Sequence, residues 1–287
     1  MTEFTWIKGI ILGLVQGVTE FFPVSSSAHL VIAESWLGIR ESVKTLAAFD
    51  VALHFGTLVA AIFFFKKDLE CLFGVWFPKW RQKLEGEQDV SAAHPPMVHT
   101  GNAKKMGPLI ILGVLPAGFI TAKFGPFFSD IFSDTIVVAI LLIITGFVIS
   151  TTRRIHGDTL NVEKIGFKQA LLVGLAQIFS VLPGISRSGV TISTGLFLRF
   201  KPELAFRFSF LMMIPLTAVT LIMDIPKILN LPPGAILAAV FGSIVAGVSG
   251  YFCIPILLEI VRRKKFFFFS YYCWAAGTLV LIKEMFF

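Results

Sequence analysis

The sequence has few charged residues: Asp, Glu, Lys and Arg make up 15% of its 287 residues, whereas hydrophobic residues make up 55%. Together with a mean hydropathy of +0.82, this composition excludes almost every soluble globular class, because too few polar side chains are present to cover a water-facing surface. A chain of this length has room for at most about ten membrane-spanning helices of roughly 20 residues each. An integral membrane protein is therefore predicted.

Cysteine is also scarce. Cys71, Cys253 and Cys273 are an odd number and have no CxxC spacing, which indicates neither a disulfide framework nor a zinc site. A cleavable leader is not expected, because Gln16 and Glu20 interrupt the first apolar run and no small-residue cleavage site follows. The net charge of +7 lies in loops without a basic stripe of interleaved aromatic residues, which argues against a nucleic-acid partner.

Six stretches are long and apolar enough to cross a bilayer. They are residues 46–65, 106–124, 135–152, 204–223, 234–260 and 266–283. Two further apolar segments, 8–38 and 167–198, are each interrupted by a proline, Pro23 or Pro183, that hydroxyl and charged residues follow. Proline ends a helical turn, and irregular backbone inside a bilayer needs protein or water around it. Both segments are therefore predicted to be re-entrant helix–loop–helix hairpins.

Four clusters of basic residues test this topology. They lie within 66–105, 153–168, 199–207 and 262–265. With six spans and two hairpins that return to the side they enter, all four clusters face one side of the membrane, which the positive-inside rule identifies as cytoplasmic. Both termini are then external, and the loop 66–105 is expected to be a solvated or partly disordered cytoplasmic connector.

The two hairpins enter from opposite sides, which is typical of inverted-topology repeats. A shift of 161 residues aligns Gln16 with Gln177 and Ser25 with Ser186. The predicted fold is an all-α polytopic membrane protein with six transmembrane helices, two re-entrant hairpins and an inverted repeat. It forms a single integral-membrane domain, 1–287, with repeat halves at 1–152 and 166–287.

The first hairpin, QGVTEFFPVSSSAH, carries the ionisable residues. Gln16 and Glu20 share a helix face, and a carboxylate inside a bilayer is costly unless it faces a partner, water or a metal. The alternative is that Glu20 lies near the membrane surface and reaches water. Ser26 and His29 follow Pro23 and place a base within one turn of a hydroxyl, an arrangement that activates a serine or a water, although serines at a helix start also serve as caps.

The second hairpin, QIFSVLPGISRSGVT, supplies Ser186, Arg187, Ser188 and Thr191 in the equivalent place. An arginine at bilayer depth needs an anion, and its planar fork fits phosphate or carboxylate. The alternative for Arg187 is an internal ion pair with Glu20. If the two tips meet, they form a site for an amphiphile with a phosphate or diphosphate headgroup, with a divalent cation between carboxylate and phosphate.

These segments resemble the signature motifs of the undecaprenyl-diphosphate phosphatase family, integral membrane proteins of bacteria that are linked to bacitracin resistance. QGVTEFFPVSSSAH is similar to the family pattern (E/Q)xxxEFxPVSS(S/T)xH and LPGISRSGVT to the pattern PGxSRSxxT, while AFDVALHFGT resembles the family's next span. The resemblance implies hydrolysis of undecaprenyl diphosphate to undecaprenyl phosphate and inorganic phosphate, which recycles the lipid carrier of cell-wall polymer synthesis. It also implies a bacterial cytoplasmic membrane and a site open to the outer face.

The resemblance assigns roles to residues by their position in the motifs. It implies catalytic roles for Glu20, Ser26, His29 and Arg187. It implies diphosphate binding by Ser25, Ser27, Gly184, Ser186, Ser188 and Thr191. It implies that Gln16 and Glu20 hold a divalent cation, Mg²⁺ or Ca²⁺. Gln16 stands where many members have Glu, so weaker metal binding is expected, and Ala28 stands where a glycine often follows the serines.

Several alternatives stay open from the sequence. Ser26 could be the nucleophile with His29 as its base or as the acid for the leaving group, or a metal-bound water could attack directly. A secondary transporter or flippase of a phosphate-bearing lipid would also combine inverted repeats, broken helices and a midplane anion site, but it needs no base beside a hydroxyl. Asp50 and His54 share a helix face and could support the site or face water. A homodimer is a further option.

Overall fold

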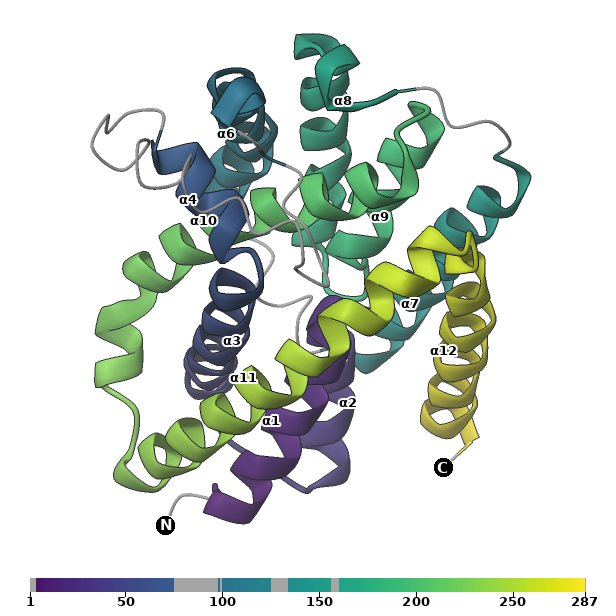
Figure 1. Cartoon of the computed structure of the whole chain (residues 1–287). Helices are drawn as coiled ribbons and strands as arrows, with labels where there is room; N and C mark the ends of the chain where they lie inside the picture. The colour runs from purple at the N-terminus through teal and green to yellow at the C-terminus, as the bar shows by residue number, and fades with distance from the viewer. Residues whose placement is uncertain (1–3, 75–97, 99, 125–133, 156–159, 287) are drawn as a thin grey trace.

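The computed structural model describes residues 4–74, 98, 100–124, 134–155 and 160–286, and this part of the chain is built of helices (Figure 1). Within it, the only strand-type pairing is an isolated bridge between Leu160 and Phe200. The same residues contain six helical segments that are long and apolar enough to cross a membrane. They belong to α3 (Val43–Phe64), α6 (Thr100–Phe124), α7 (Thr135–Ser150), α10 (Pro202–Leu229), α11 (Pro233–Arg262) and α12 (Phe269–Phe286).

These helices confirm the six predicted spans. The largest differences in the bounds are at the start of α6 and the end of α10, which each extend about two turns past the predicted limit. The reason is that an apolar window finds the membrane-buried part of a helix, whereas hydrogen bonding carries the helix on into polar sequence.

The two interrupted segments are each two helices. In the first, α1 (Trp6–Phe21) ends just before Pro23 and α2 (Ser26–Trp36) follows it. In the second, α8 (Phe167–Gln177) continues into the 3₁₀ turn η5 (Ile178–Val181), and α9 (Arg187–Phe197) begins after Pro183. Proline has no N–H to donate and disfavours a helical conformation in the residue before it, which accounts for both breaks.

Glycines bring the short helices close to the long ones. A methyl group added at Gly13 of α1 would lie 2.2 Å from the carbonyl oxygen of Gly242 in α11. In the second segment, a methyl group at Gly174 of α8 would lie 2.5 Å from the carbonyl oxygen of Gly113 in α6. Backbones in such close contact require residues without a side chain, so α1 packs along α11, and α8 along α6.

The remaining long helices surround this framework. α3 packs against α10 and α11, and α7 lies alongside α12 (Figure 1). The first turn of α1 and the last turn of α12 lie at the same end of the molecule, at the lower edge of Figure 1. The side of a membrane on which each terminus lies stays a prediction.

Part of the predicted solvated connector 66–105 is ordered helix, which corrects that expectation. The chain forms α4 (Lys66–Gly74) directly after α3, and α6 already begins at Thr100; residues 75–97 and 99 lie outside the described part. Asp68 of α4 is buried and accepts hydrogen bonds from Arg207 Nη1 at 2.7 Å and from the Val98 amide at 2.8 Å. This buried ion pair joins α4 to α10. The charged residues of the loop sequence do not indicate that one of its aspartates is buried.

Candidate active site

The tips of the two interrupted segments meet inside the molecule. The amide of Gly184 donates to Ser25 Oγ at 3.1 Å, and Ser188 Oγ donates to the carbonyl of Phe22 at 3.5 Å. Both contacts join residues more than 150 positions apart in the chain. The two tips, whose meeting the sequence left as a condition, therefore lie together.

Unusual backbone conformations shape both tips. Ser25 has a φ of 66°, a left-handed conformation that costs a non-glycine residue about 1 kcal/mol or more. Gly184 has a φ of +105°, and a methyl group there would lie 2.5 Å from the carbonyl oxygen of Val138. Only glycine therefore fits position 184, in both its backbone conformation and the space available. This requirement is separate from the predicted role of Gly184 in diphosphate binding, which stays a prediction.

Thr145 of α7 forms hydrogen bonds with the backbone of the second tip. The sequence alone did not indicate this residue. Its side chain is fully buried, its hydroxyl donates to the Gly184 carbonyl at 2.8 Å, and it accepts from the Ser186 amide at 3.1 Å. These two bonds satisfy backbone groups that the proline break leaves without helical partners. The signal in the sequence was one threonine in the middle of a strongly apolar span, and such a residue is too common to be assigned a role.

Glu20 lies at the centre of the group of side chains at this junction. Its Oε2 accepts hydrogen bonds from Ser26 Oγ at 2.6 Å and from Gln16 Nε2 at 3.1 Å. Its Oε1 pairs with the guanidinium of Arg187. With 4% of its side chain exposed, Glu20 is thus a buried carboxylate stabilised by its partners, rather than one that reaches water at the membrane surface.

Arg187, the first residue of α9, forms the internal ion pair that the sequence left as an alternative to an anion site. Its Nη2 contacts Glu20, and its Nη1 donates to Thr217 Oγ1 of α10 at 3.2 Å. Its side chain keeps 17% exposure. A guanidinium has five N–H donors, so Arg187 can contact a phosphate while it keeps one of these partners.

His54 of α3 joins the same carboxylate, which resolves one of the open alternatives. Its Nε2 lies 3.4 Å from Glu20 Oε2, and its Nδ1 lies 2.7 Å from the Asp50 carbonyl. Because Nδ1 faces a carbonyl, it carries a proton, and the contact with the carboxylate is attractive only if Nε2 carries one too. His54 therefore lies beside Glu20 and adds an attractive charge to it when its ring is protonated, and the Asp50 carbonyl contacts the other ring nitrogen.

His29 forms no hydrogen bond with Ser26, contrary to the expected pairing of hydroxyl and base. Its Nδ1 faces the Ser25 carbonyl at 2.8 Å, and its Nε2 lies 2.8 Å from the hydroxyl of Tyr272 in α12. Ser26 donates to Glu20 instead, because the turn at Ser25 directs its hydroxyl back toward α1. Tyr272 is a second residue that the sequence alone did not indicate. A tyrosine at the start of a span usually indicates an interfacial anchor, so it does not point to a functional site.

The serines and threonine predicted to hold the diphosphate are mostly engaged in building the tips. Ser25 and Ser186 each cap a helix, accepting from the amides of Ala28 at 3.4 Å and Gly189 at 3.1 Å. Thr191 donates to the Arg187 carbonyl at 2.8 Å and lies 2.5 Å from Ser209 Oγ. The buried members of the set are Ser25, Ser186, Ser188 and Thr191, whereas Ser27 is partly exposed. Contact between these residues and a diphosphate stays a prediction.

Comparison with known proteins decides the family. A family model described as bacitracin resistance protein BacA matches residues 9–279. The chain belongs to the BacA family. The match includes both interrupted segments and all six candidate spans almost to their ends.

BacA relatives of similar length cover nearly the whole chain. Proteins named undecaprenyl-diphosphatase from Methanosphaera stadtmanae, Halothermothrix orenii and Methanobrevibacter smithii are 37%, 34% and 32% identical to it. In each case the match covers 96% of this chain and 96–97% of the relative. The chain and these relatives are thus similar over almost their whole length.

Two oxygen atoms at the centre of this BacA site are of the kind that hard cations bind. Gln16 is fully buried, and its Oε1 has no hydrogen-bond partner within the described residues. Glu20 Oε2 lies on the same helix face, bonded to the Gln16 amide nitrogen. Hard cations such as Mg²⁺ and Ca²⁺ take oxygen ligands, and Mg²⁺ in particular keeps waters and substrate phosphates among them. No cluster of three or more His, Cys, Asp or Glu ligands occurs in the described part, so most of a cation's ligands would come from water and substrate.

Proposed function

We propose that this protein hydrolyses undecaprenyl diphosphate to undecaprenyl phosphate and inorganic phosphate. The observation that carries the proposal is the group Glu20, Ser26 and Arg187, which joins a hydroxyl, a carboxylate and a guanidinium where the two tips meet. A lipid substrate suits a site enclosed by membrane-spanning helices. The family and the names of its curated relatives support the same reaction. Recycling of the carrier for cell-wall polymers and bacitracin resistance are the expected consequences in the cell.

Substrate binding begins with the partly exposed groups. Arg187 opens α9 and Ser26 opens α2, so the free amides of two helix starts lie at the same junction. Helix N-termini and a guanidinium are both suited to phosphate. We expect the diphosphate to draw Arg187 partly from Glu20, with Ser27 as a further donor, while the isoprenoid tail stays among the apolar helix faces.

Ser26 is the nucleophile in the proposed reaction. Its Oγ forms a bond to the terminal phosphorus, the bond from that phosphorus to the bridging oxygen breaks, and undecaprenyl phosphate leaves. The Ser26 proton passes to Glu20 Oε2, which already accepts the hydroxyl at 2.6 Å. Arg187 stabilises the negative charge on the phosphoryl oxygens during the displacement. Water then cleaves the phosphoserine and releases inorganic phosphate.

His29 is the remaining acid–base group near the tips. Its Nδ1 carries a proton toward the Ser25 carbonyl, so a neutral ring leaves Nε2 as the basic atom, which accepts from Tyr272. We assign His29 to the second step, in which Nε2 takes the proton of the Tyr272 hydroxyl while that hydroxyl takes a proton from the attacking water. This differs from a role as the base of Ser26 because no hydrogen bond joins the two side chains.

Gln16 and Glu20 would hold a divalent cation, Mg²⁺ or Ca²⁺. Bound there, such a cation would neutralise charge on the diphosphate oxygens. The buried, unpaired Oε1 of Gln16 supports this assignment. Because Gln16 contributes no charge, binding is expected to depend strongly on the substrate's own phosphates.

The proposed topology is an inverted repeat of two halves, 1–152 and 166–287, with the interrupted segments as re-entrant hairpins. Two mirrored features support it. The close contact of Gly13 with α11 has its counterpart in that of Gly174 with α6. The hydroxyl pairs Ser25–Ser27 and Ser186–Ser188, which occupy matching positions in the two halves, are both 3.2 Å apart. We place the protein in the bacterial cytoplasmic membrane, with the tips open to the external face.

Phosphate release by the purified protein tests the proposed function. The full chain in detergent, supplied with undecaprenyl diphosphate and Mg²⁺ or Ca²⁺, is expected to release inorganic phosphate. Arg187→Ala should lower the rate by about 10²-fold or more, whereas Arg263→Ala, which changes an exposed arginine paired with Glu259, should not. A folded protein that binds the lipid diphosphate but releases no phosphate would instead be a transporter or flippase.

A further inference from the structure

Thr217 of α10 contacts the proposed catalytic group from outside the two tips. Its Oγ1 accepts a hydrogen bond from Arg187 Nη1 at 3.2 Å. The contact is possible because α10 packs against α9, which begins at Arg187. Thr217 lies 30 positions after Arg187 and belongs to neither sequence motif, so the motifs give it no role.

The hydroxyl of Thr217 differs from those of the other buried threonines in the described part of the chain. A threonine hydroxyl can donate one hydrogen bond and accept two, and within a helix it commonly donates to a carbonyl of the preceding turn. Thr217 donates to no group among the described residues, so its hydrogen is available while Arg187 occupies its oxygen. The other four buried threonines each donate to a backbone carbonyl, at 2.6–3.1 Å; they are Thr19, Thr57, Thr145 and Thr191.

An available donor at this position favours a ligand that accepts hydrogen bonds. Thr217 is 8% exposed, and residues 212–223, MMIPLTAVTLIM, are apolar apart from two threonines. A buried donor without an acceptor destabilises a protein, because it has lost its hydrogen bonds to water. A bound ligand with acceptor oxygens beside Arg187 would supply the missing partner.

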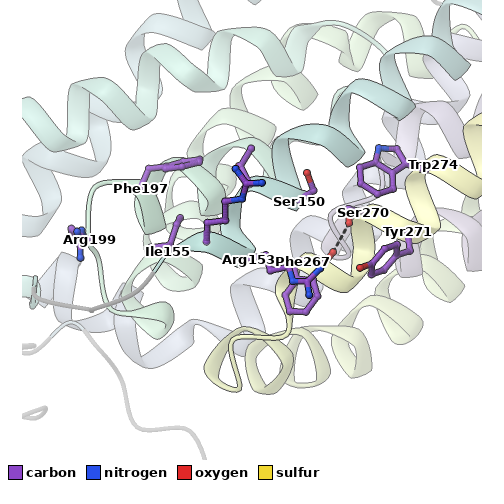
Figure 2. A pocket seen from close by; sticks show the side chains of 11 residues that line it. Ser150, Arg153, Ile155, Phe197, Arg199, Phe267, Ser270, Tyr271 and Trp274 are labelled. Carbon is purple, nitrogen blue, oxygen red and sulfur yellow. Dashed lines mark hydrogen bonds between the residues drawn. The ribbon is translucent and has the colours of Figure 1, made fainter.

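Arg187 depends on Thr217 for its direction because the arginine is largely withdrawn from water. Its side chain is 17% exposed, and its two terminal nitrogens contact Glu20 and Thr217. The arginines near the opposite end of α9 are different: Arg153 and Arg199 line a hollow at the surface and are exposed (Figure 2). Water can surround an exposed guanidinium, whereas the few protein partners of a buried one set its orientation.

We propose that Thr217 is a phosphate-binding residue, whose oxygen holds Arg187 Nη1 and whose hydrogen is donated to an oxygen of the terminal phosphate of the lipid diphosphate. This inference rests on the proposed function, because it concerns the same site. When the diphosphate draws Nη2 away from Glu20, the contact with Thr217 keeps the guanidinium in place. An ionised phosphate has only acceptor oxygens, so the guanidinium and the hydroxyl both donate to it.

Calorimetric titration of the full chain in detergent with Mg²⁺ and farnesyl methylenediphosphonate tests the proposal. In this probe a methylene group replaces the bridging oxygen and prevents hydrolysis. Thr217→Val keeps the shape of the side chain but removes the hydroxyl, and should raise the Kd about tenfold or more. Thr217→Ser keeps the hydroxyl and should bind within about threefold of wild type. The matched control is Thr220→Val in the same helix, which should bind as wild type does, because the Thr220 hydroxyl already donates to the Leu216 carbonyl at 3.1 Å.

Two outcomes would overturn the proposal. One is a wild-type Kd for Thr217→Val, and the other is a Thr217→Ser protein that binds as weakly as Thr217→Val, because packing would then explain the loss. Thr217→Ala, which needs less space, repeats the test if the valine variant does not fold. The titration does not depend on turnover. A wild type that binds the probe but releases no phosphate from undecaprenyl diphosphate would therefore contradict the proposed reaction, while the Thr217 variants would still test phosphate binding.

Discussion

Glu20 has partners from three parts of the chain. Gln16 and Ser26 belong to its own interrupted segment, whereas His54 comes from α3 and Arg187 from α9. The sequence placed Gln16 on the same helix face as Glu20 and gave the ion pair with Arg187 as an alternative to an anion site. It paired Ser26 with His29 instead of with Glu20. It left His54 open, because a helical period identifies a shared face but not the helix that this face meets.

Ser26 tests the proposed nucleophile. Ser26→Ala should lower phosphate release by about 10²-fold or more, because it removes the attacking oxygen. Ser35→Ala is the matched control, since Ser35 is an exposed serine of the same helix. Rapid acid quenching of the wild type during turnover should trap a phosphoserine at Ser26. A Ser26→Ala rate near that of wild type would show that water attacks the phosphorus directly.

Tyr272 tests the role of His29. Tyr272→Phe removes the hydrogen bond to His29 Nε2 and leaves the aromatic ring, whose centre lies 5.6 Å from that of the histidine. A hydrogen bond of about 1 kcal/mol corresponds to about a fivefold change in rate. We expect kcat to fall by about that factor with KM unchanged, and Tyr271→Phe to have no such effect on kcat. Equal effects of the two variants would argue against a role of Tyr272 through His29.

At the scale of helices, the sequence predicted much of the fold. Apolar length located all six spans, and Pro23 and Pro183 located both helix breaks. The helix α4 was missed because its Asp68 is buried in an ion pair with Arg207, 139 positions away. Thr145 was missed for a similar reason: its hydrogen bonds go to a tip that is remote in sequence.

The glycine contact between α1 and α11 provides a stability test. Gly13→Ala would place a methyl group 2.2 Å from the Gly242 carbonyl oxygen, so the two helices must separate. Overpacking of this kind costs about 1–3 kcal/mol, which should lower the melting temperature in detergent. Gly118→Ala is the control, because its methyl group would meet nothing closer than 3.8 Å and alanine favours a helix. Equal melting temperatures for the two variants would contradict this packing.

At the scale of the whole molecule, an apolar shell of helices encloses the polar residues around Glu20 where the tips meet. This site was predictable because both motifs carry polar residues next to a proline break. The exposed arginines at the far end of α9 were predicted only as part of the basic clusters that the positive-inside rule explains.

The most direct test of the central claim is phosphate release from undecaprenyl diphosphate by Glu20→Gln. This variant keeps the shape of the side chain but removes the charge that holds Ser26, Arg187 and His54 together. We predict a loss of about 10²-fold or more in kcat/KM with the fold intact, and less than a twofold change for Glu70→Gln, a partly exposed glutamate of α4. A Glu20→Gln protein that releases phosphate at the wild-type rate would contradict the account.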